Sequence, residues 1–367
     1  MLRLLILGTG NWAASHAAAF AAIPGCQVAA GVDAHLERAR RFCATHAIPC
    51  AFDDLDLAIR WGEFDAAVNV TPDGAHHPTT MKLIAAGKHV FCEKPLAESY
   101  PLAKEMTDAI EAAGLVGMVN LTYRNVAALQ EARAMIAAGA IGEVRHVEAS
   151  YRQSWLVGRH SGDWRTEERW LWRLSEAHGS KGVLGDVGIH ILDFATYAIG
   201  LEPVSLQARL QTFPKAPGDR IGDYVLDAND SAVMSLTFAN GALGVVHASR
   251  FMTGYANSLR LQVFGDRGAL ELDYSHAHTR LRACDGEHVH DQSWRDVPCP
   301  AVPTNQARFA EAVRTGRTVE PSFRRATELQ KVLDACFEPR TQQAVALGAE
   351  ARQSANRAAA LQGHTAA

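Results

Sequence analysis

The stretch Gly8-Thr9-Gly10-Asn11-Trp12-Ala13 decides the fold, because it joins an apolar run at residues 2–7 to an alanine-rich stretch at 13–22. The run predicts a buried strand, and the stretch after it predicts a helix. A G-x-G-x-x-A turn between a strand and a helix is typical of dinucleotide binding. Gly8 permits the tight turn, and Gly10 lets the backbone approach a pyrophosphate at the helix N-terminus. The expected cofactor contacts here are Gly8, Gly10, Asn11 and Trp12.

The N-terminal third alternates short apolar runs with helical patterns. Besides residues 2–7, the expected strands are 28–32, 66–70, 89–92 and 116–119. Such alternation indicates a parallel sheet covered by helices. We therefore expect a Rossmann NAD(P)-binding domain at residues 1–120, as part of an α/β plus α+β chain.

Asp33 follows the second expected strand, where a carboxylate accepts hydrogen bonds from ribose hydroxyls and repels a 2′-phosphate. This position favours NAD over NADP. An alternative is that Asp33 caps the helix that begins near His35. Arg38, Arg40 and Arg41 lie on that helix, so NADP stays open as a second cofactor.

Composition limits the partners and the compartment. The 367 residues are enough for two domains, and 36 basic residues balance 40 acidic ones without a long run of either sign. We therefore expect a small-molecule substrate, with no nucleic acid and no membrane as partner. The run at residues 2–7 is too short for a signal peptide. Seven scattered cysteines, none spaced C-x-x-C, favour reduced thiols in a cytoplasmic protein.

The second half contains alternating strands without intervening helices. The expected strands are residues 143–151, 204–212, 231–238, 243–250, 260–265 and 268–274. They predict a mostly antiparallel open sheet in a substrate-binding and oligomerisation domain at residues 121–337. One face of such a sheet is left for a second subunit. Residues 338–367 are rich in alanine and glutamine and are expected to form a loose helix or disordered tail.

Two segments resemble a known family. Residues 68–76 read V-N-V-T-P-D-G-A-H, and residues 86–95 read A-G-K-H-V-F-C-E-K-P. Both are similar to the Gfo/Idh/MocA family of glucose-fructose oxidoreductase and inositol dehydrogenase. The resemblance implies that Lys94 is the active-site lysine. It also implies cofactor contacts from Thr71, Pro72, His76, Glu93 and Lys94.

The resemblance extends over roughly residues 2–337 and includes G-D-V-G-I-H-I-L-D at residues 185–193. If residues 186–197 form an α-helix, Asp186, His190, Asp193 and Tyr197 share one face while the other faces are apolar. This polar stripe is expected to meet a cleft. The alternative is an internally satisfied helix in which Asp186 and His190 hydrogen-bond each other across one turn.

These residues predict a mechanism for oxidising a secondary alcohol. His190 suits proton transfer, Asp186 is placed to fix its tautomer, and Lys94 is placed to stabilise charge on the substrate oxygen. Whether Lys94 or His190 is the base stays open. We expect further substrate contacts from Tyr123 and Arg124.

Four of the seven tryptophans fall between residues 151 and 173, interleaved with arginines. Aromatic faces of this kind suit a sugar, and we expect Trp164, Arg165 and Trp172 to bind substrate. The alternative is a subunit or domain contact. No metal is expected, since neither the pair at residues 76–77 nor that at 288 and 290 has a third ligand at a suitable spacing.

The combined expectation is an NAD(P)-dependent oxidoreductase acting on a sugar, sugar derivative or cyclitol, and the resemblance implies a homodimer or homotetramer. One rival is a redox-assisted glycoside-cleaving enzyme with tightly bound NAD and no net redox change. The other is a non-catalytic dinucleotide-binding protein.

Overall fold

The computed structural model describes residues 1–343. Its N-terminal part is a six-stranded parallel sheet with strand order β3-β2-β1-β4-β5-β6. This is the Rossmann order, and the helices cover both faces. The strands are β1 Leu2–Leu7, β2 Cys26–Val32, β3 Cys50–Phe52, β4 Ala66–Asn69, β5 His89–Cys92 and β6 Gly117–Val119. The helices between them are α1 Asn11–Ala21, α2 Leu36–Thr45, α3 Leu55–Trp61, α4 Asp73–Ala85 and α5 Tyr100–Ala112.

The C-terminal part is built on an eight-stranded sheet with order β16-β15-β14-β13-β7-β12-β11-β8. All of its neighbouring strands are antiparallel except β7 and β12, which are parallel. The strands are β7 Val144–Arg152, β8 Pro203–Gln211, β11 Ser231–Phe238, β12 Leu243–Ser249, β13 Ser258–Gly265, β14 Gly268–Tyr274, β15 Thr279–Asp285 and β16 Arg295–Asp296. A separate hairpin joins β9 Arg220–Ile221 to β10 Tyr224–Val225.

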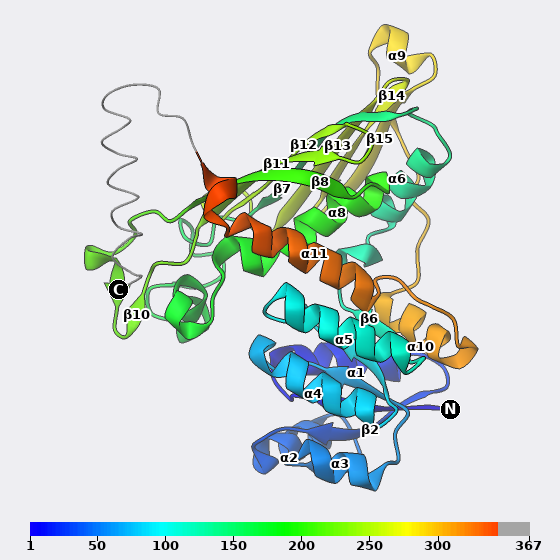
Figure 1. Cartoon of the computed structure of the whole chain (residues 1–367), viewed down its shortest axis with the longest axis vertical. Helices are drawn as coiled ribbons and strands as arrows, with labels where there is room; N and C mark the ends of the chain where they lie inside the picture. Colours follow the sequence, from blue (N-terminus) through cyan, green and yellow to red (C-terminus); the bar gives the residue numbers. More distant parts are fainter. Residues whose placement is uncertain (344–367) are drawn as a thin grey trace.

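Helices cover one face of the large sheet. The helix α8 (Ile189–Ile199) packs on β7, β12 and β13, and α6 (Ala127–Ala137) packs on β14 and β15 (Figure 1). Alternate residues such as Leu259, Leu261 and Val263 point into this core and are almost fully buried. The opposite face carries the intervening residues of the same strands, so the expected open sheet is confirmed.

The last described helices return to the N-terminal domain. Phe309 of α10 (Asn305–Thr315) packs in the same core cluster as Phe20 and Phe91. The helix α11 (Phe323–Cys336) packs on α5 and also contacts α8, so it runs along both domains (Figure 1). The expected domain boundaries at 120/121 and 337/338 stay predictions, and of the expected tail only residues 338–343 lie within the described part of the chain.

The expected strands are found with ends shifted by at most two residues, and those at 2–7, 89–92, 231–238 and 268–274 match exactly. No sequence pattern predicted β3 or β15, nor the three two-residue strands β9, β10 and β16. The strand β3 is only half-buried and three residues long, too short for a periodic pattern. In β15 the arginines at 280 and 282 alternate with the buried Leu281 and Ala283, and two apolar residues alone are too weak a signal for a strand.

Candidate active site

The glycine turn has the geometry that a dinucleotide requires. Gly8 has a φ of 88°, and a Cβ there would lie 2.7 Å from the carbonyl oxygen of Val70. A Cβ on Gly10 would meet nothing within 4 Å, so this side of the turn is open. Gly10 is the N-cap of α1, which has no side-chain cap and no acidic residue in its first turn. The free amide groups and this open space fit the pyrophosphate of NAD.

Asp33 is tied to the same turn. Its Oδ2 accepts hydrogen bonds from the amide and the hydroxyl of Thr9 at 3.1 and 2.7 Å, and its Oδ1 accepts one from the amide of His35 at 3.0 Å. Burial opposes ionisation of Asp33, but these hydrogen bonds and Arg38 nearby lower its pKa. The hydrogen bond from the His35 amide closes a turn before α2 and does not cap the helix, because the N-cap is His35 and no side chain caps that end. Asp33 is therefore an ionised group beside the turn.

His76 has a different role from the one expected. Its ring is completely buried in α4, where Nε2 lies 2.9 Å from the carbonyl oxygen of Thr71 and Nδ1 lies 2.7 Å from that of Pro95. Both ring nitrogens are thus used inside the protein. The expectation that the His76 side chain contacts the cofactor is therefore wrong, because the ring is not exposed. It joins the Thr71-Pro72 turn to the loop that carries Lys94.

Lys94 and Asp186 come together from opposite domains. The Lys94 Nζ lies 2.9 Å from the backbone carbonyl oxygen of Asp186 and 3.6 Å from its Oδ1. Lys94 follows β5 at the carboxyl edge of the Rossmann sheet, the edge at which such sheets bind ligands. Both side chains are about one-fifth to one-quarter exposed, so they remain accessible to a small molecule.

Two arginines that sequence reasoning had not assigned to the site also face Asp186. Its Oδ2 lies 3.4 Å from Nη2 of Arg250 and 3.8 Å from Nε of Arg173. Burial opposes ionisation, but the charges of Lys94, Arg173 and Arg250 lower the pKa of Asp186 to about 2. Arg250 directly follows β12 and its side chain is fully buried. An arginine at the end of one strand is common, so no pattern in the sequence singled it out.

The helix expected at 186–197 begins differently. Residues Leu184–Gly188 form a π-helical turn, and the α-helical part is Ile189–Ile199. Because a π-turn winds more slowly than an α-helix, Asp186 is displaced from the face that carries His190. The carboxylate of Asp186 faces Lys94 and Arg250. Nδ1 of His190 is buried and has no hydrogen-bond partner among the described residues. The expected hydrogen bond between Asp186 and His190 is therefore wrong.

His190 remains beside the other two groups. Burial, followed by the charge of Lys94, lowers the pKa of His190 to about 3, so the ring is neutral near pH 7. The ring of Tyr123 meets it edge-on with centroids 5.1 Å apart, and Tyr151 lies beyond at 6.5 Å. Burial raises the pKa of Tyr123 to about 12, so its hydroxyl stays protonated. Tyr123 thus lies beside His190, and its contact with substrate stays a prediction.

Arg124 lies elsewhere. Its Nε and Nη2 donate to the two carboxylate oxygens of Asp193 at 2.6 and 2.7 Å, and its guanidinium stacks 3.4 Å from the Tyr197 ring centroid. Arg325 also donates to Asp193 at 3.0 Å. With only 2% of Arg124 exposed, the expectation that it binds substrate is wrong. The rear half of the predicted polar stripe therefore faces the interior, where Asp193 forms an ion pair with Arg124 and the Tyr197 ring stacks on the Arg124 guanidinium.

The tryptophan-rich segment divides into buried and exposed residues. Trp164 is 2% exposed, packs with Trp155 and donates from Nε1 to the carbonyl oxygen of Leu156, so the substrate role expected for it is wrong. Arg165 is an exposed residue over the ring of Trp164. Trp172 is 38% exposed and lies under the guanidinium of Arg173, which connects it to Asp186.

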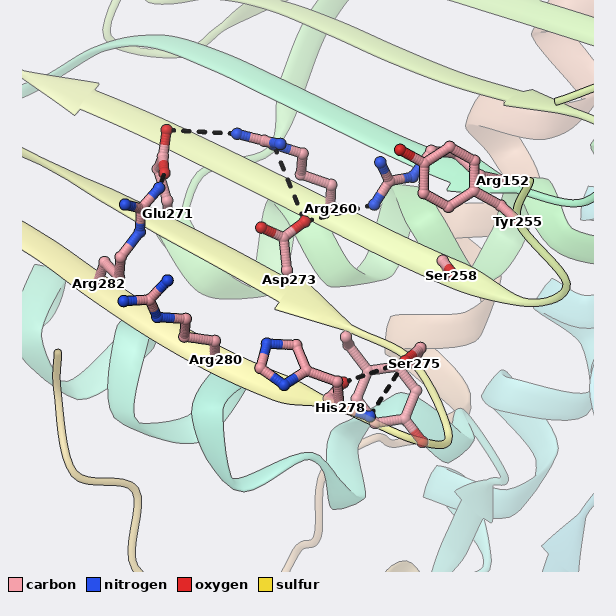
Figure 2. Close-up of a pocket in the computed structure, with 11 residues that line it drawn as sticks. Arg152, Tyr255, Ser258, Arg260, Glu271, Asp273, Ser275, His278, Arg280 and Arg282 are labelled. Atoms are coloured by element: carbon pink, nitrogen blue, oxygen red, sulfur yellow. Dashed lines mark hydrogen bonds and ion pairs between the residues drawn. The ribbon is translucent and has the colours of Figure 1, made fainter. Parts of the chain in front are cut away.

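A pocket of about 340 Å³ lies on the open face of the large sheet (Figure 2). Arg152, Arg260 and Arg282 reach over neighbouring strands toward Glu271 and Asp273. Glu271 accepts hydrogen bonds from both Arg260 and Gln262, so its charge is satisfied within the network. This pocket is separate from the Lys94 site.

The described residues contain seven free cysteines, no group of three metal-ligating side chains and no helix long and apolar enough to cross a membrane. Cys92 is completely buried, and burial raises its pKa, as a packing role requires.

Family models match both parts of the chain. The oxidoreductase family model with an NAD-binding Rossmann fold matches residues 2–121, and the GFO/IDH/MocA C-terminal domain model matches residues 129–271. The chain belongs to the GFO/IDH/MocA family of oxidoreductases. The resemblance of the two sequence motifs is thereby confirmed, and so is the expected NAD-binding fold.

Several relatives are named as dehydrogenases of a cyclic sugar derivative or a cyclitol. Levoglucosan dehydrogenase of Pseudarthrobacter phenanthrenivorans is 27% identical, over 92% of this chain and 95% of the relative. The scyllo-inositol 2-dehydrogenase of Bacillus subtilis is 25% identical, over 86% of this chain and 87% of its own length. Among solved structures, levoglucosan dehydrogenase in complex with NADH has a TM-score of 0.81 at 26% identity, covering 93% of this chain and 96% of that one.

Proposed function

We propose that this protein is an NAD-dependent dehydrogenase that oxidises a secondary alcohol of a sugar, sugar derivative or cyclitol. The observation that carries the proposal is the meeting of Lys94, Asp186 and His190 at the carboxyl edge of a Rossmann sheet whose glycine turn is open. Relatives named as levoglucosan and inositol dehydrogenases support the substrate class.

The residues of the chain have complementary roles in this proposal. NAD, when bound, supplies the hydride acceptor. Lys94, anchored by Asp186, donates a hydrogen bond to the substrate oxygen and stabilises negative charge that develops there. The neutral ring of His190 accepts a hydrogen bond from the substrate hydroxyl, whose proton passes either to His190 or to Lys94 in its uncharged form as the hydride leaves. Tyr123 borders the ring of His190 and excludes water from that side.

The cofactor contacts follow the turn geometry. We propose that the backbone of Gly8, Gly10, Asn11 and Trp12 faces the pyrophosphate, and that Asp33 faces the adenosine ribose. Thr71, Pro72 and Glu93 are proposed to border the nicotinamide half, because they lie in the loops after β4 and β5. Trp172 and Arg173 are proposed to border the substrate.

A polyol panel tests the activity. The purified protein is given NAD or NADP together with inositols, aldoses, levoglucosan and methyl glycosides, while absorbance at the reduced-nicotinamide band is followed. We expect a signal with one polyol and NAD that disappears in Lys94→Ala and His190→Ala, with NADH still binding to both variants. Release of aglycone without net NADH formation would instead support redox-assisted glycoside cleavage. NAD binding with neither reaction would support a non-catalytic protein.

We also propose a homo-oligomer in which a second copy covers the open face of the large sheet. Val233, Leu243 and Val245 are 37–55% exposed on the neighbouring strands β11 and β12, in the same sheet as the charged network of Figure 2. An apolar stripe beside paired charges is a pattern that protein interfaces share. We propose that the protein works in the cytoplasm, because its seven cysteines are free thiols, as is usual in a reducing compartment.

A further inference from the structure

A buried histidine of the cofactor helix lies behind the lysine loop. His16 is 2% exposed in the second turn of α1, on the same face as Ala13 and Phe20. Its Nε2 lies 2.8 Å from Oε1 of Glu93, the residue that precedes Lys94. His16 lies outside both the glycine turn and the Glu-Lys-Pro motif, and the proposed mechanism gives it no role.

Glu93 is the centre of a small hydrogen-bond network. Its Oε1 also accepts from Nδ2 of Asn120 at 2.7 Å, and its Oε2 accepts from the backbone amide of Lys94 at 3.1 Å. Burial opposes ionisation of Glu93, but the hydrogen bonds from His16 and Asn120 and the charge of Lys94 lower its pKa to about 2. The carboxylate is therefore ionised while it faces away from solvent.

The helix α10 closes this network from behind. Nε2 of Gln306 lies 3.3 Å from Nδ1 of His16, and Nδ2 of Asn305 donates to Oδ1 of Asn120 at 3.2 Å. With the amide of Gln306 donating, His16 Nδ1 is the acceptor and Nε2 carries the proton that it donates to Glu93. Three elements thus hold one carboxylate in one orientation.

The orientation matters because the carboxylates of Asp186, Glu93 and Asp73 all act on Lys94. Asp186 holds the ammonium in the site, while the charge of Glu93 also acts on Lys94 from the adjacent residue. We propose that His16 is a positioning residue for Lys94: by holding the Glu93 carboxylate, it prevents that group from competing with Asp186 for the ammonium. The consequence for turnover rests on the proposed function.

A conservative pair of variants tests the hydrogen bond. His16→Leu removes both polar atoms, whereas His16→Gln keeps an N–H near the place of Nε2. We expect His16→Leu to lower kcat by about 30-fold with a KM for NAD within about 3-fold of wild type, and His16→Gln to recover most of kcat. A matched control is His77→Leu, since His77 forms a similar 2.9 Å pair with Glu105 on the surface. Equal losses in His16→Leu and His16→Gln would overturn the proposal.

A double variant tests whether His16 acts through Glu93. In a Glu93→Gln background, His16→Leu should cause little further loss of kcat, because the carboxylate that it restrains is absent. Full additivity of the two losses would refute the proposed route. Thermal melting of each variant separates loss of folded protein from loss of rate.

Lys94 can also be followed without a substrate. The rate at which trinitrobenzenesulfonate modifies Lys94, measured by peptide mass spectrometry, should fall in His16→Leu by about 3-fold or more, because an ammonium held by two carboxylates loses its proton less readily. His77→Leu should match wild type. An unchanged rate in His16→Leu would overturn the positioning role, whereas failure of every polyol in the panel would overturn only the proposed function.

Discussion

The Lys94 ammonium lies 2.9 Å from the backbone carbonyl oxygen of Asp186 and 3.6 Å from its carboxylate, so a residue of the C-terminal domain orients the lysine of the N-terminal domain. The carbonyl contact survives when the side chain changes, but the charge does not. We therefore expect Asp186→Asn to keep the fold and lower kcat by about 100-fold, mainly through loss of charge-charge orientation.

Steady-state kinetics on the substrate found by the panel check this expectation. Asp108→Asn is a suitable control, because it alters a Lys-Asp pair of α5 that is exposed on both sides. A kcat for Asp186→Asn equal to that of the control would contradict the orientation by charge.

The neutral His190 ring predicts a loss of stability in acid. Its pKa is about 3 in the folded protein against 6.5 for the free side chain, so between these values the unfolded chain binds the additional proton. Stability then falls as the pH falls below 6.5, by on the order of 2 kcal/mol between pH 8 and pH 5. In His190→Gln this component should be missing. Urea unfolding at both pH values measures it, and the same pH dependence in both proteins would show that His190 is accessible to protons in the folded state.

The buried Arg124–Asp193 pair predicts strong coupling between two positions. Arg124→Met leaves Asp193 with Arg325 alone, and breaking a buried ion pair in this way costs about 3 kcal/mol or more. The double variant Arg124→Met, Asp193→Leu removes both charges and should cost clearly less than the sum of the single variants. Chemical denaturation measures all three. Additive losses would mean that the two side chains do not depend on each other.

Asp33 predicts cofactor choice and affinity together. Asp33→Ser removes the charge that repels a 2′-phosphate and leaves Arg38, which lies 3.6 Å from the carboxylate, free for it. Because the same carboxylate holds Thr9, NAD binding should weaken by about 10-fold or more while the NADP-to-NAD ratio of affinities rises. Fluorescence titration with NADH and NADPH gives both numbers. An unchanged ratio would separate Asp33 from cofactor choice.

The exposed stripe on the large sheet predicts assembly. Leu243 is 55% exposed opposite the helix-covered face, so Leu243→Asp places a charge where the second copy is proposed to lie. The mass measured by light scattering after gel filtration should fall toward that of the monomer, with the melting curve showing a folded protein. Val157→Asp, at a 51% exposed residue in the tryptophan-rich segment, is the control. A wild-type protein that is already monomeric would contradict the proposed oligomer.

The fold could be predicted well from the sequence because its signals are local. Each of the long strands has its own apolar pattern, and the turn at Gly8 fixes the helix that follows. The short β3 and the arginine-rich β15 have no such pattern, since pairing with their neighbours defines them.

The candidate site could be predicted only where a motif carries its own context. The motifs singled out Lys94, Asp186 and His190, which the fold brings together with Tyr123 beside them, and their catalytic roles are proposals. The assumption of uniform helical pitch placed Asp186 against His190, and the π-turn at Leu184–Gly188 removes that contact.

Other site residues could not be predicted because their partners come from distant segments. Arg250 faces Asp186 from the end of β12. Arg124 lies outside the site, because it pairs with Asp193 and stacks on Tyr197. For His16 a weak signal did exist, since it is a polar residue on the buried face of an alanine-rich helix.

The N-terminal sheet ends at β6, whose Val119 amide donates to the carbonyl oxygen of Pro321 while Met118 bridges to Ser322. During synthesis the Rossmann strands leave the ribosome first. The segment that pairs with their edge and the Phe309 ring that packs in their core leave only after the whole C-terminal sheet. Until then the nascent N-terminal domain has an unpaired sheet edge at β6 and lacks Phe309 in its hydrophobic core. A ribosome stalled before residue 305 would present a species that calls for chaperones, and cutting the gene at the apparent domain border would not yield two independent proteins.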